Sequence, residues 1–419
     1  MLNYKISLSR FLVGFILIAN IKFFSVPGSY AILGSICNYY SKLLVCLAIA
    51  LFFVAEHIII TKNKYTQVVI AFLLLIGATI IYTVINYPNQ SFFLILKKYY
   101  YFGAVWFAVP LMSFLKRNNN LQWFFKFIAL IGLIYSVYVI LVKIVFNFTG
   151  VLLIDTNMQY IQMRGGSLRL ARTSTFISVS TIIALSNYIK EFKNQKKFFS
   201  INFLSFVFGL ISIFWVGMTR ISELAVVVSG GIIIILSFKK YMKVLVSVFL
   251  VVCLPIIYQT IMDFYYSFYS KETVLGTEVR TEGYSYFLSH MFDGKIFGMG
   301  LLTSERYHSL LYGAEGRFIL SDLGYIGYIG IFGICGIVFL LYLFRTVMKT
   351  IKKTYQNQLL PQYPEVIGYL LFFGISGISL AFTDAQRCLY LPIMIILYWI
   401  IDEIVLTDKN TIKRGITKQ

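Results

Sequence analysis

Residues 66–85 read TQVVIAFLLLIGATIIYTVI, a run without a single charged side chain. Such a run is typical of a helix that crosses a bilayer, because about 20 apolar residues rising 1.5 Å each span the hydrocarbon core. Similar runs recur along the whole chain. We predict about twelve spanning helices, at residues 8–25, 41–60, 66–85, 99–115, 121–146, 173–189, 199–218, 221–238, 243–263, 322–344, 362–382 and 388–405.

The composition supports a membrane-embedded fold over the entire chain. Only 13% of the 419 residues are charged, about half the share found in soluble proteins, and 59% are hydrophobic. This excludes an ordinary soluble enzyme, a disordered protein and a coiled coil. Apolar runs such as Val244 to Ile257 do not alternate with polar residues, which excludes spanning β-strands. We therefore expect one all-α, polytopic membrane domain over residues 1–419.

The basic residues predict the orientation of these helices. If the N-terminus is cytoplasmic, 22 of the 37 lysines and arginines fall on the cytoplasmic side, and every cytoplasmic loop is basic. An even number of spans then places the C-terminus in the cytoplasm as well. We interpret the net charge of +20 in this way, and not as a sign of nucleic-acid binding.

The outer side is rich in arginine, whereas 18 of the 25 lysines lie inside. Orientation alone does not require this split, because both residue types anchor cytoplasmic loops. Arginine is favoured where a planar fork must hold phosphate or carboxylate. The plainer alternative is that the outer arginines pair with outer acids or lipid headgroups. The outer arginines are Arg164, Arg169, Arg172, Arg220, Arg280, Arg306, Arg317 and Arg387.

One long polar connection, residues 264–321, separates two predicted spans, and we expect it outside the cell. Connections of this length are usually functional. In or at the edge of it lie eight of the seventeen acidic residues, together with many aromatic residues. Aromatic rings beside carboxylates suit sugar binding, although such rings are equally typical of a membrane interface.

The most specific signals lie between Glu278 and Gly336. No GxxxxGK[ST], GxGxxG or DxD motif occurs, so neither an ATP motor nor a metal-dependent nucleotide-sugar enzyme is indicated. The span that begins near residue 322 carries a glycine at every third position, which permits close approach of another backbone. These glycines are Gly324, Gly327, Gly330, Gly333 and Gly336.

In its layout and motifs the chain resembles the O-antigen polymerase and ligase superfamily, multispan enzymes that handle undecaprenyl-linked glycans. The likeness covers about twelve spans, one long outer loop late in the chain, and loose motifs in a matching order. These motifs are the stretch Arg164–Phe176, the turn Met218–Arg220, Arg280, the turn Phe297–Gly300, and the helix start Asp322-x-Gly324-x-x-Gly327. Ligases typically carry a His-Asn pair about nine residues before that acid, where this chain has Gly313-Ala314. A Wzy-type polymerase is therefore favoured.

The resemblance implies a metal-independent, cofactor-free glycosyltransferase of the bacterial cytoplasmic membrane. It would join lipid-linked oligosaccharide repeats into O-antigen, capsular polysaccharide or exopolysaccharide on the outer face. The implied partners are an undecaprenyl-pyrophosphate-linked glycan donor, a similar acceptor and the lipid bilayer. A chain-length regulator is a further candidate partner, and nucleic acid is not expected.

Such a reaction needs cations on the pyrophosphate and a base near the acceptor hydroxyl. The expected pyrophosphate-binding residues are Arg172, Arg220, Arg280 and Arg317, with Arg164, Arg169 and Arg387 as outer members. The candidate bases are Asp322, Glu315, Glu282 and His308. No metal site is expected.

Each candidate also has a purely structural interpretation. Asp322 could cap the following helix, and Arg220 could pair with Glu223 one turn later. Arg387 could pair with Asp384. Arg169 and Arg172 are three positions apart, so they could share one helix face and bind anionic headgroups there.

Two other functions stay open at this point. A ligase would move the glycan to a different acceptor. A flippase or transporter would have the same number of spans and the same basic charge. Flippases usually show two similar halves with short loops, whereas this chain has one asymmetric long loop.

Overall fold

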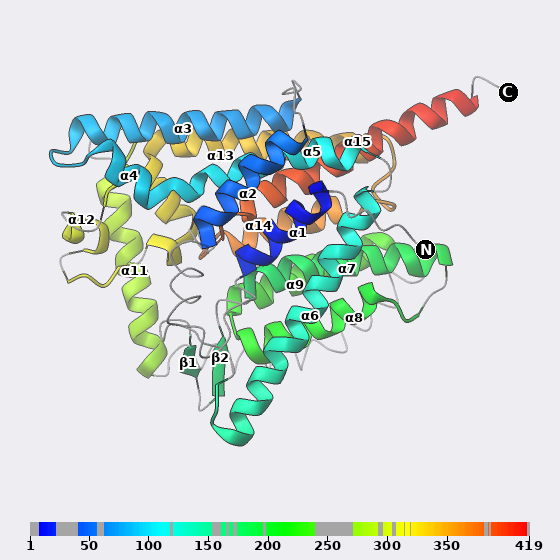
Figure 1. The fold of residues 1–419 in the computed structure, drawn as a ribbon, viewed down its shortest axis with the longest axis horizontal. Helices are drawn as coiled ribbons and strands as arrows, with labels where there is room; N and C mark the ends of the chain where they lie inside the picture. The colour runs from blue at the N-terminus through cyan, green and yellow to red at the C-terminus, as the bar shows by residue number, and fades with distance from the viewer. Residues whose placement is uncertain are drawn as a thin grey trace.

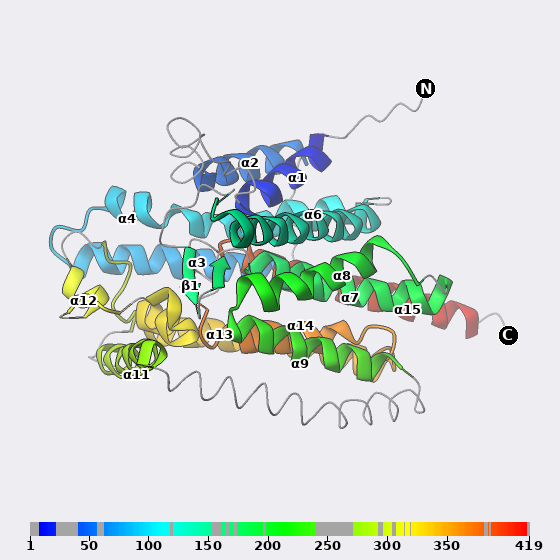
Figure 2. The same ribbon diagram turned by 90° about the horizontal axis from the view of Figure 1, so that it is seen from below.

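The computed structural model describes most of the chain, and within it nearly all residues are helical (Figures 1 and 2). The described residues are 8–21, 41–56, 63–117, 120–152, 161–164, 167–170, 174–195, 198–238, 271–291, 296–303, 307–313, 315–318, 320–380, 384 and 387–416. The predicted span 243–263 lies outside them.

In the described part of the chain, helices follow one another and one short hairpin of two antiparallel strands lies between them. The first half comprises α1 (Leu8–Ile21), α2 (Ser41–Ala55), α3 (Lys64–Asn86), α4 (Phe92–Tyr99), the 3₁₀ helix η3 (Tyr100–Phe107), α5 (Ala108–Lys116), α6 (Asn120–Thr149), β1 (Ile161–Arg164) and β2 (Ser167–Leu170). The second half comprises α7 (Ser174–Gln195), α8 (Ile201–Ile211), the π-helical turn η6 (Ser212–Gly217), α9 (Arg220–Ser237), α11 (Lys271–Met291), α12 (His308–Tyr312), η7 (Leu320–Asp322), α13 (Gly324–Gln356), α14 (Glu365–Ser376) and α15 (Tyr390–Ile416).

Six helical stretches among the described residues are long and apolar enough to cross a bilayer. They are Lys64–Asn86, Phe92–Lys116, Asn120–Thr149, Arg220–Ser237, Gly324–Gln356 and Tyr390–Thr407. Large apolar side chains also face outward, for example Leu74 and Ile85 on α3 and Leu341 on α13. Exposing such apolar surfaces to water costs free energy, whereas contact with lipid does not. The chain is a multi-pass helical membrane protein, as the composition predicts.

Several predicted spans match observed helices closely, and others differ for local reasons. The run 66–85 lies within α3, and the run 221–238 corresponds to α9. The run 322–344 is extended to Gln356, because a helix can continue beyond the apolar region with a basic surface. The predicted span 362–382 contains only the short helix α14, which follows Pro364 and ends before Gly377. Within the long connection 264–321, helix α11 replaces the loop that we expected.

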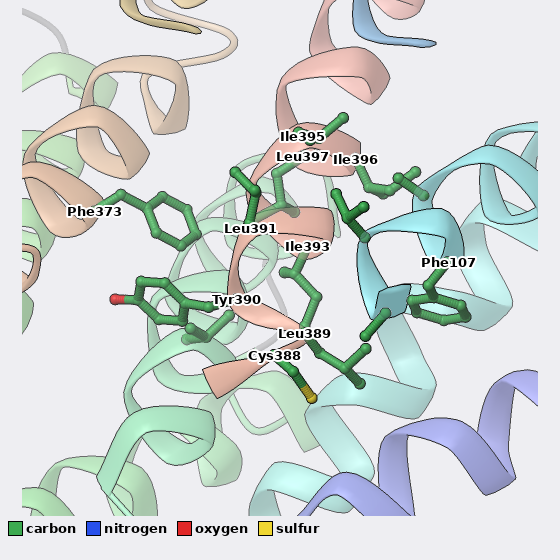
Figure 3. Close-up of a cluster of buried hydrophobic side chains, with 14 of the residues drawn as sticks. Phe107, Phe373, Cys388, Leu389, Tyr390, Leu391, Ile393, Ile395, Ile396 and Leu397 are labelled. Atoms are coloured by element: carbon green, nitrogen blue, oxygen red, sulfur yellow. The ribbon is translucent and has the colours of Figure 1, made fainter. Parts of the chain in front are cut away.

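Helix α15 is the most buried of the long helices (Figure 3). Its first turns present Leu391, Ile396 and Leu397 to neighbouring helices, and all three are nearly inaccessible. The Tyr390 ring packs edge-on against Phe373 of α14, with ring centres 4.8 Å apart. A helix that is apolar on every side belongs in the centre of a bundle.

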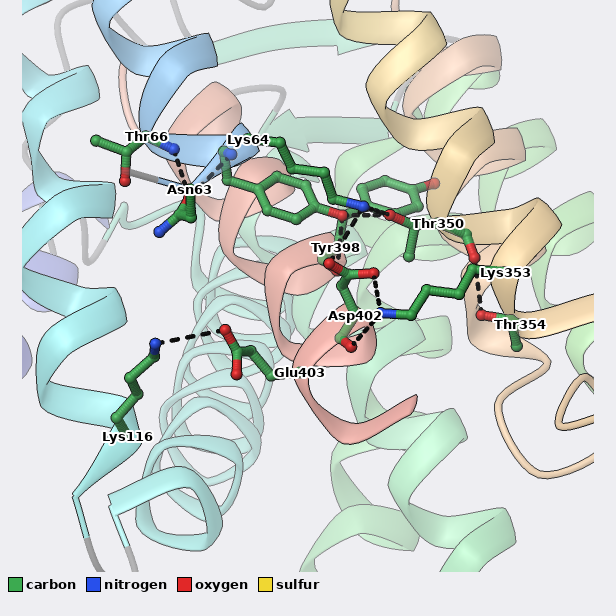
Figure 4. Close-up of polar contacts among 11 residues, drawn as sticks. Asn63, Lys64, Thr66, Lys116, Thr350, Lys353, Thr354, Tyr398, Asp402 and Glu403 are labelled. Carbon is green, nitrogen blue, oxygen red and sulfur yellow. Dashed lines mark hydrogen bonds and ion pairs between the residues drawn. The ribbon is translucent and has the colours of Figure 1, made fainter. Parts of the chain in front are cut away.

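Ion pairs gather where α3 begins and where α13 passes the second half of α15 (Figure 4). The Asp402 carboxylate lies 3.1 Å from the Lys64 ammonium and 2.8 Å from that of Lys353. The Lys64 ammonium also donates to the Thr350 hydroxyl at 3.0 Å. The neighbouring Glu403 pairs with Lys116 at 3.4 Å. One carboxylate therefore joins three helices, and we call this end of the bundle the ion-paired end.

We predict that Asp402→Asn destabilises the bundle by about 1 to 3 kcal/mol, because it leaves two lysines partly buried without their carboxylate. Glu403→Gln is the matched control: its carboxylate is 41% exposed, so we expect less than about 1 kcal/mol. Thermal unfolding of the purified protein in detergent measures both effects. Equal losses in the two variants would contradict the role assigned to Asp402.

Candidate functional site

At the other end of the bundle, the chain makes an irregular turn between α8 and α9. Residues Ser212–Gly217 form a π-helical turn, closed by a hydrogen bond from the Met218 amide to the Ile213 carbonyl at 3.0 Å. Met218 then adopts a left-handed conformation with φ 44°, and α9 begins at Arg220. Single π-helical turns of this kind are frequent at functional sites.

A buried lysine from α6 is attached to this turn. The Lys143 side chain is fully buried, and its ammonium donates to the Trp215 carbonyl. The same ammonium lies 5.1 Å from the centre of the Trp215 ring and 3.9 Å from the Met218 sulfur. Over the described ranges of the chain, no carboxylate lies within ion-pair distance of Lys143. A charge buried in this way is costly unless the surroundings compensate it.

An arginine from the hairpin reaches the same turn. Arg169 lies in β2, opposite Gln162 of β1. Its Nε donates to the Gly217 carbonyl at 3.3 Å, and its Nη2 donates to the Thr219 hydroxyl at 3.4 Å. Arg220 follows directly as the first residue of α9. Lys143 and Arg169 thus contact a segment that ends in a third cationic residue, and we call Lys143, Arg169 and residues 215–220 the basic turn.

The start of α9 adds a further positive contribution at the basic turn. Thr219 is the N-cap residue, and its side chain makes no capping hydrogen bond to the helix. The first N–H groups of a helix and its dipole favour an anion in this position, and the Glu223 carboxylate already belongs to this first turn. The basic turn is therefore suited to hold a group with several negative oxygens.

Sequence reasoning anticipated part of the basic turn and missed the rest. It selected Arg169 and Arg220, but it did not select Lys143. The available signal was the position of Lys143 inside a mostly apolar predicted span, because an ionisable residue there is a functional candidate by default. The expectation that Arg169 lies on a helix is wrong, since the residue belongs to a strand.

Two other predicted arginines form ion pairs with nearby acids. Arg317 pairs with Glu315 in an exposed segment before α13. Arg387 pairs with Asp384 at 3.4 Å, and both side chains are mostly buried. The Arg387 Nε is buried and has no hydrogen-bond partner within the described part of the molecule. For these two arginines the structure shows pairing with nearby acids, as the plainer interpretation expects.

The remaining candidates are spread over several separate segments of the chain. Arg280 and Glu282 are exposed on α11. Two residues apart on a helix, they do not face one another. His308 is exposed at the start of α12, with its ring centre 4.7 Å from that of Tyr312. Arg172 lies outside the described residues, and Arg164 ends β1 with its side chain undescribed.

Asp322 ends the short helix η7 and is half-buried beside the start of α13. The prediction that it caps α13 is wrong. The capping position belongs to Leu323, which makes no side-chain hydrogen bond to the helix. Asp322 therefore does not cap α13, and it remains a candidate base.

The glycine stripe of α13 receives the turn that contains Phe297 and Gly300. The helix breaks at Gly333, where φ is 58° and ψ is −143°. The Met299 and Gly300 amides donate to carbonyls of α13 at 2.9 and 3.0 Å, and the Cys335 amide donates back to the Ile296 carbonyl at 3.3 Å. The acceptors of the first two bonds are Gly330 and Ile331. The close backbone approach predicted from the glycine spacing is confirmed.

The aromatic residues of the long connection pack into a small hydrophobic core of their own. Phe287 of α11, Met299, and Leu311 of α12 are buried in it. The Tyr286 hydroxyl donates to the carbonyls of residues 309 and 310 at 3.2 Å each. Burial raises the pKa of the Tyr286 phenol, so it remains a neutral donor. These rings attach α11 and α12 to the bundle.

Comparison with known proteins assigns the chain to no family. No model of a known protein family matches this sequence, and no curated protein matches it either.

We predict that Gly298→Ala destabilises the protein by roughly 2 to 4 kcal/mol, because φ is +55° there and a Cβ atom would lie 2.5 Å from the Gly330 carbonyl oxygen. Gly77→Ala on α3 is the control. A Cβ atom there meets open space, and we expect no loss and a gain of up to about 1 kcal/mol. Thermal unfolding in detergent distinguishes them. If Gly298→Ala unfolds at the temperature of the parent protein, the turn does not depend on this contact.

Proposed function

We propose that the chain is a polysaccharide polymerase of the multi-pass membrane glycosyltransferase type. It would join undecaprenyl-pyrophosphate-linked oligosaccharide repeats on the outer face of the bacterial cytoplasmic membrane. The product would be O-antigen, capsular polysaccharide or exopolysaccharide. The observation that carries the proposal is the basic turn, where Lys143, Arg169 and Arg220 meet at the start of α9.

In this reaction the acceptor hydroxyl attacks the anomeric carbon of the growing chain. The bond from that carbon to the pyrophosphate oxygen breaks, and the polyprenyl pyrophosphate leaves with the additional negative charge. Preorganised cations stabilise that charge in the transition state. Arg169 would offer a planar fork, and the buried Lys143 would add a point charge that acts from behind the turn without touching the substrate. A base takes the proton of the attacking hydroxyl, and Asp322 is our first candidate for it.

The distribution of charge supports the proposed orientation. We propose twelve spans, with both termini in the cytoplasm and the basic turn outside. At the ion-paired end, lysines meet carboxylates in pairs such as Lys190 with Glu365 and Lys353 with Asp402. At the basic turn, Lys143 donates to a backbone carbonyl, and among the described residues no carboxylate lies within ion-pair distance of it. A cation held by a neutral group keeps more of its charge available for an anionic substrate.

One observation favours a second candidate function, movement of the lipid-linked oligosaccharide across the membrane. Helix α13 is discontinuous at Gly333, and a non-helical segment packs into the break. Discontinuous helices often form the substrate site of transporters. In this protein the break is filled by the Phe297–Gly300 backbone, which favours a structural role for it.

We predict that Arg169→Gln and Lys143→Met each lower the polymerisation rate about 100-fold, the usual effect of removing one preorganised donor to developing charge. Lys126→Gln is the matched control, because Lys126 is an exposed lysine at the opposite end of α6. The measurement is the length distribution of polysaccharide in cells lacking the native protein, with membrane insertion checked by immunoblot. The same assay on Arg280→Ala and Arg317→Ala tests the earlier assignment of those two residues. Normal long chains from Arg169→Gln and Lys143→Met would remove the basic turn from the mechanism.

The orientation predicts opposite labelling of two exposed positions. In intact cells, a membrane-impermeant thiol reagent should modify His308→Cys and leave Lys116→Cys unmodified until the membrane is permeabilised. Both positions are solvent-exposed, so access from one side of the membrane decides the result. The parent chain, with its native cysteines, supplies the background. The reverse pattern would place the basic turn in the cytoplasm and exclude polymerisation outside.

A further inference from the structure

A cavity of about 370 Å³ lies at the ion-paired end, away from the basic turn. The last turns of α7, the last residue of α9 and the segment leading into α14 enclose it. Its volume is within the range of small-molecule sites. The polar residues around it include Lys190, Lys193, Asn194, Ser237, Gln362 and Glu365.

The two lysines of this cavity are in different situations. Lys190 is paired with Glu365, whose side chain is only 5% exposed, and lies 4.8 Å from the centre of the Tyr363 ring. Lys193 donates to the Ser237 carbonyl, and no carboxylate lies within ion-pair distance of it in the described part of the chain. One positive charge in the cavity is therefore not neutralised by an acid.

The position of the cavity relative to the helix ends indicates which class of ligand it can bind. Ser237 is the last residue of the spanning helix α9, and Lys193 lies in the last turn of α7. Pro364 precedes the first turn of α14. Residues at the ends of apolar helices lie at the depth of lipid headgroups. Basic pockets between helices at this depth are suited to phosphate-bearing headgroups.

We propose that this cavity binds the headgroup of an anionic phospholipid. The phosphate lies on Lys193, and the headgroup hydroxyls exchange hydrogen bonds with Asn194, Ser237 and Gln362. Glu365 keeps Lys190 occupied, so the cavity carries one net positive charge, matching a phosphodiester with one negative charge. The proposal is independent of the polymerase assignment, because it uses no residue of the basic turn.

Native mass spectrometry of the full chain in detergent tests this proposal directly. The probes are phosphatidylglycerol, phosphatidylethanolamine with the same acyl chains, and inorganic phosphate. We expect a retained phosphatidylglycerol adduct, and weaker binding of phosphatidylethanolamine because its ammonium offsets the phosphate charge. Lys193→Gln should weaken the phosphatidylglycerol adduct about tenfold, the effect of losing one charge-assisted hydrogen bond.

Two further variants keep the test decisive. Lys116→Gln removes an exposed lysine at the same end that does not line the cavity, and it should retain the lipid. Gln362→Glu adds a negative charge at an exposed position of the cavity, and it should weaken binding even if Lys193→Gln fails to fold. The proposal is overturned if Lys193→Gln or Gln362→Glu retains as much phosphatidylglycerol as the parent chain. It is also overturned if Lys116→Gln loses as much phosphatidylglycerol as Lys193→Gln does. Full displacement by inorganic phosphate would also overturn it, since the ligand would then be free phosphate.

Discussion

The insertion of the Phe297–Gly300 turn into the break in α13 is the contact on which the packing around α13 depends. Inside a bilayer, a helix that breaks exposes amides and carbonyls that no water can satisfy. Here the inserted turn supplies the partners: Met299 and Gly300 donate to α13, and Cys335 donates back. The Leu301 amide then donates to the Thr83 hydroxyl of α3 at 2.9 Å, and the Leu302 carbonyl accepts from the Tyr99 hydroxyl at 2.6 Å. A single non-helical segment thereby joins three elements.

The charged side chains have different partners at the two ends of the bundle. At the ion-paired end, carboxylates such as Asp402 lie between lysines and connect helices that are distant in sequence. At the basic turn, Lys143 donates to the Trp215 carbonyl, and no carboxylate lies within ion-pair distance of it among the described residues. A carboxylate cancels most of the field of a cation, whereas a carbonyl only orients it. The first arrangement stabilises a fold, and the second leaves charge for a ligand.

The sequence predicts the membrane class and several helices well, because an uncharged run of about 20 residues has few other structures open to it. It predicts helix ends less well: α13 continues past its apolar part, and α14 is shortened between Pro364 and Gly377. The site was predicted in part. We selected Arg169 and Arg220 because arginine binds phosphate well. The hairpin and the pairing of Arg317 with Glu315 depend on tertiary contacts, which the periodicity of the sequence does not reveal.

The π-helical turn at Ser212–Gly217 makes the attachment of the cations a matter of register more than of residue identity. The wider ring closed between Met218 and Ile213 occurs where the Trp215 and Gly217 carbonyls accept from Lys143 and Arg169. Exchanging side chains along this segment leaves those acceptors in place. Deleting one residue would convert the ring to an ordinary helical turn and rotate every later carbonyl by about 100°. The length of this segment is therefore a constraint separate from the side chains of Trp215 and Met218, which also contact Lys143.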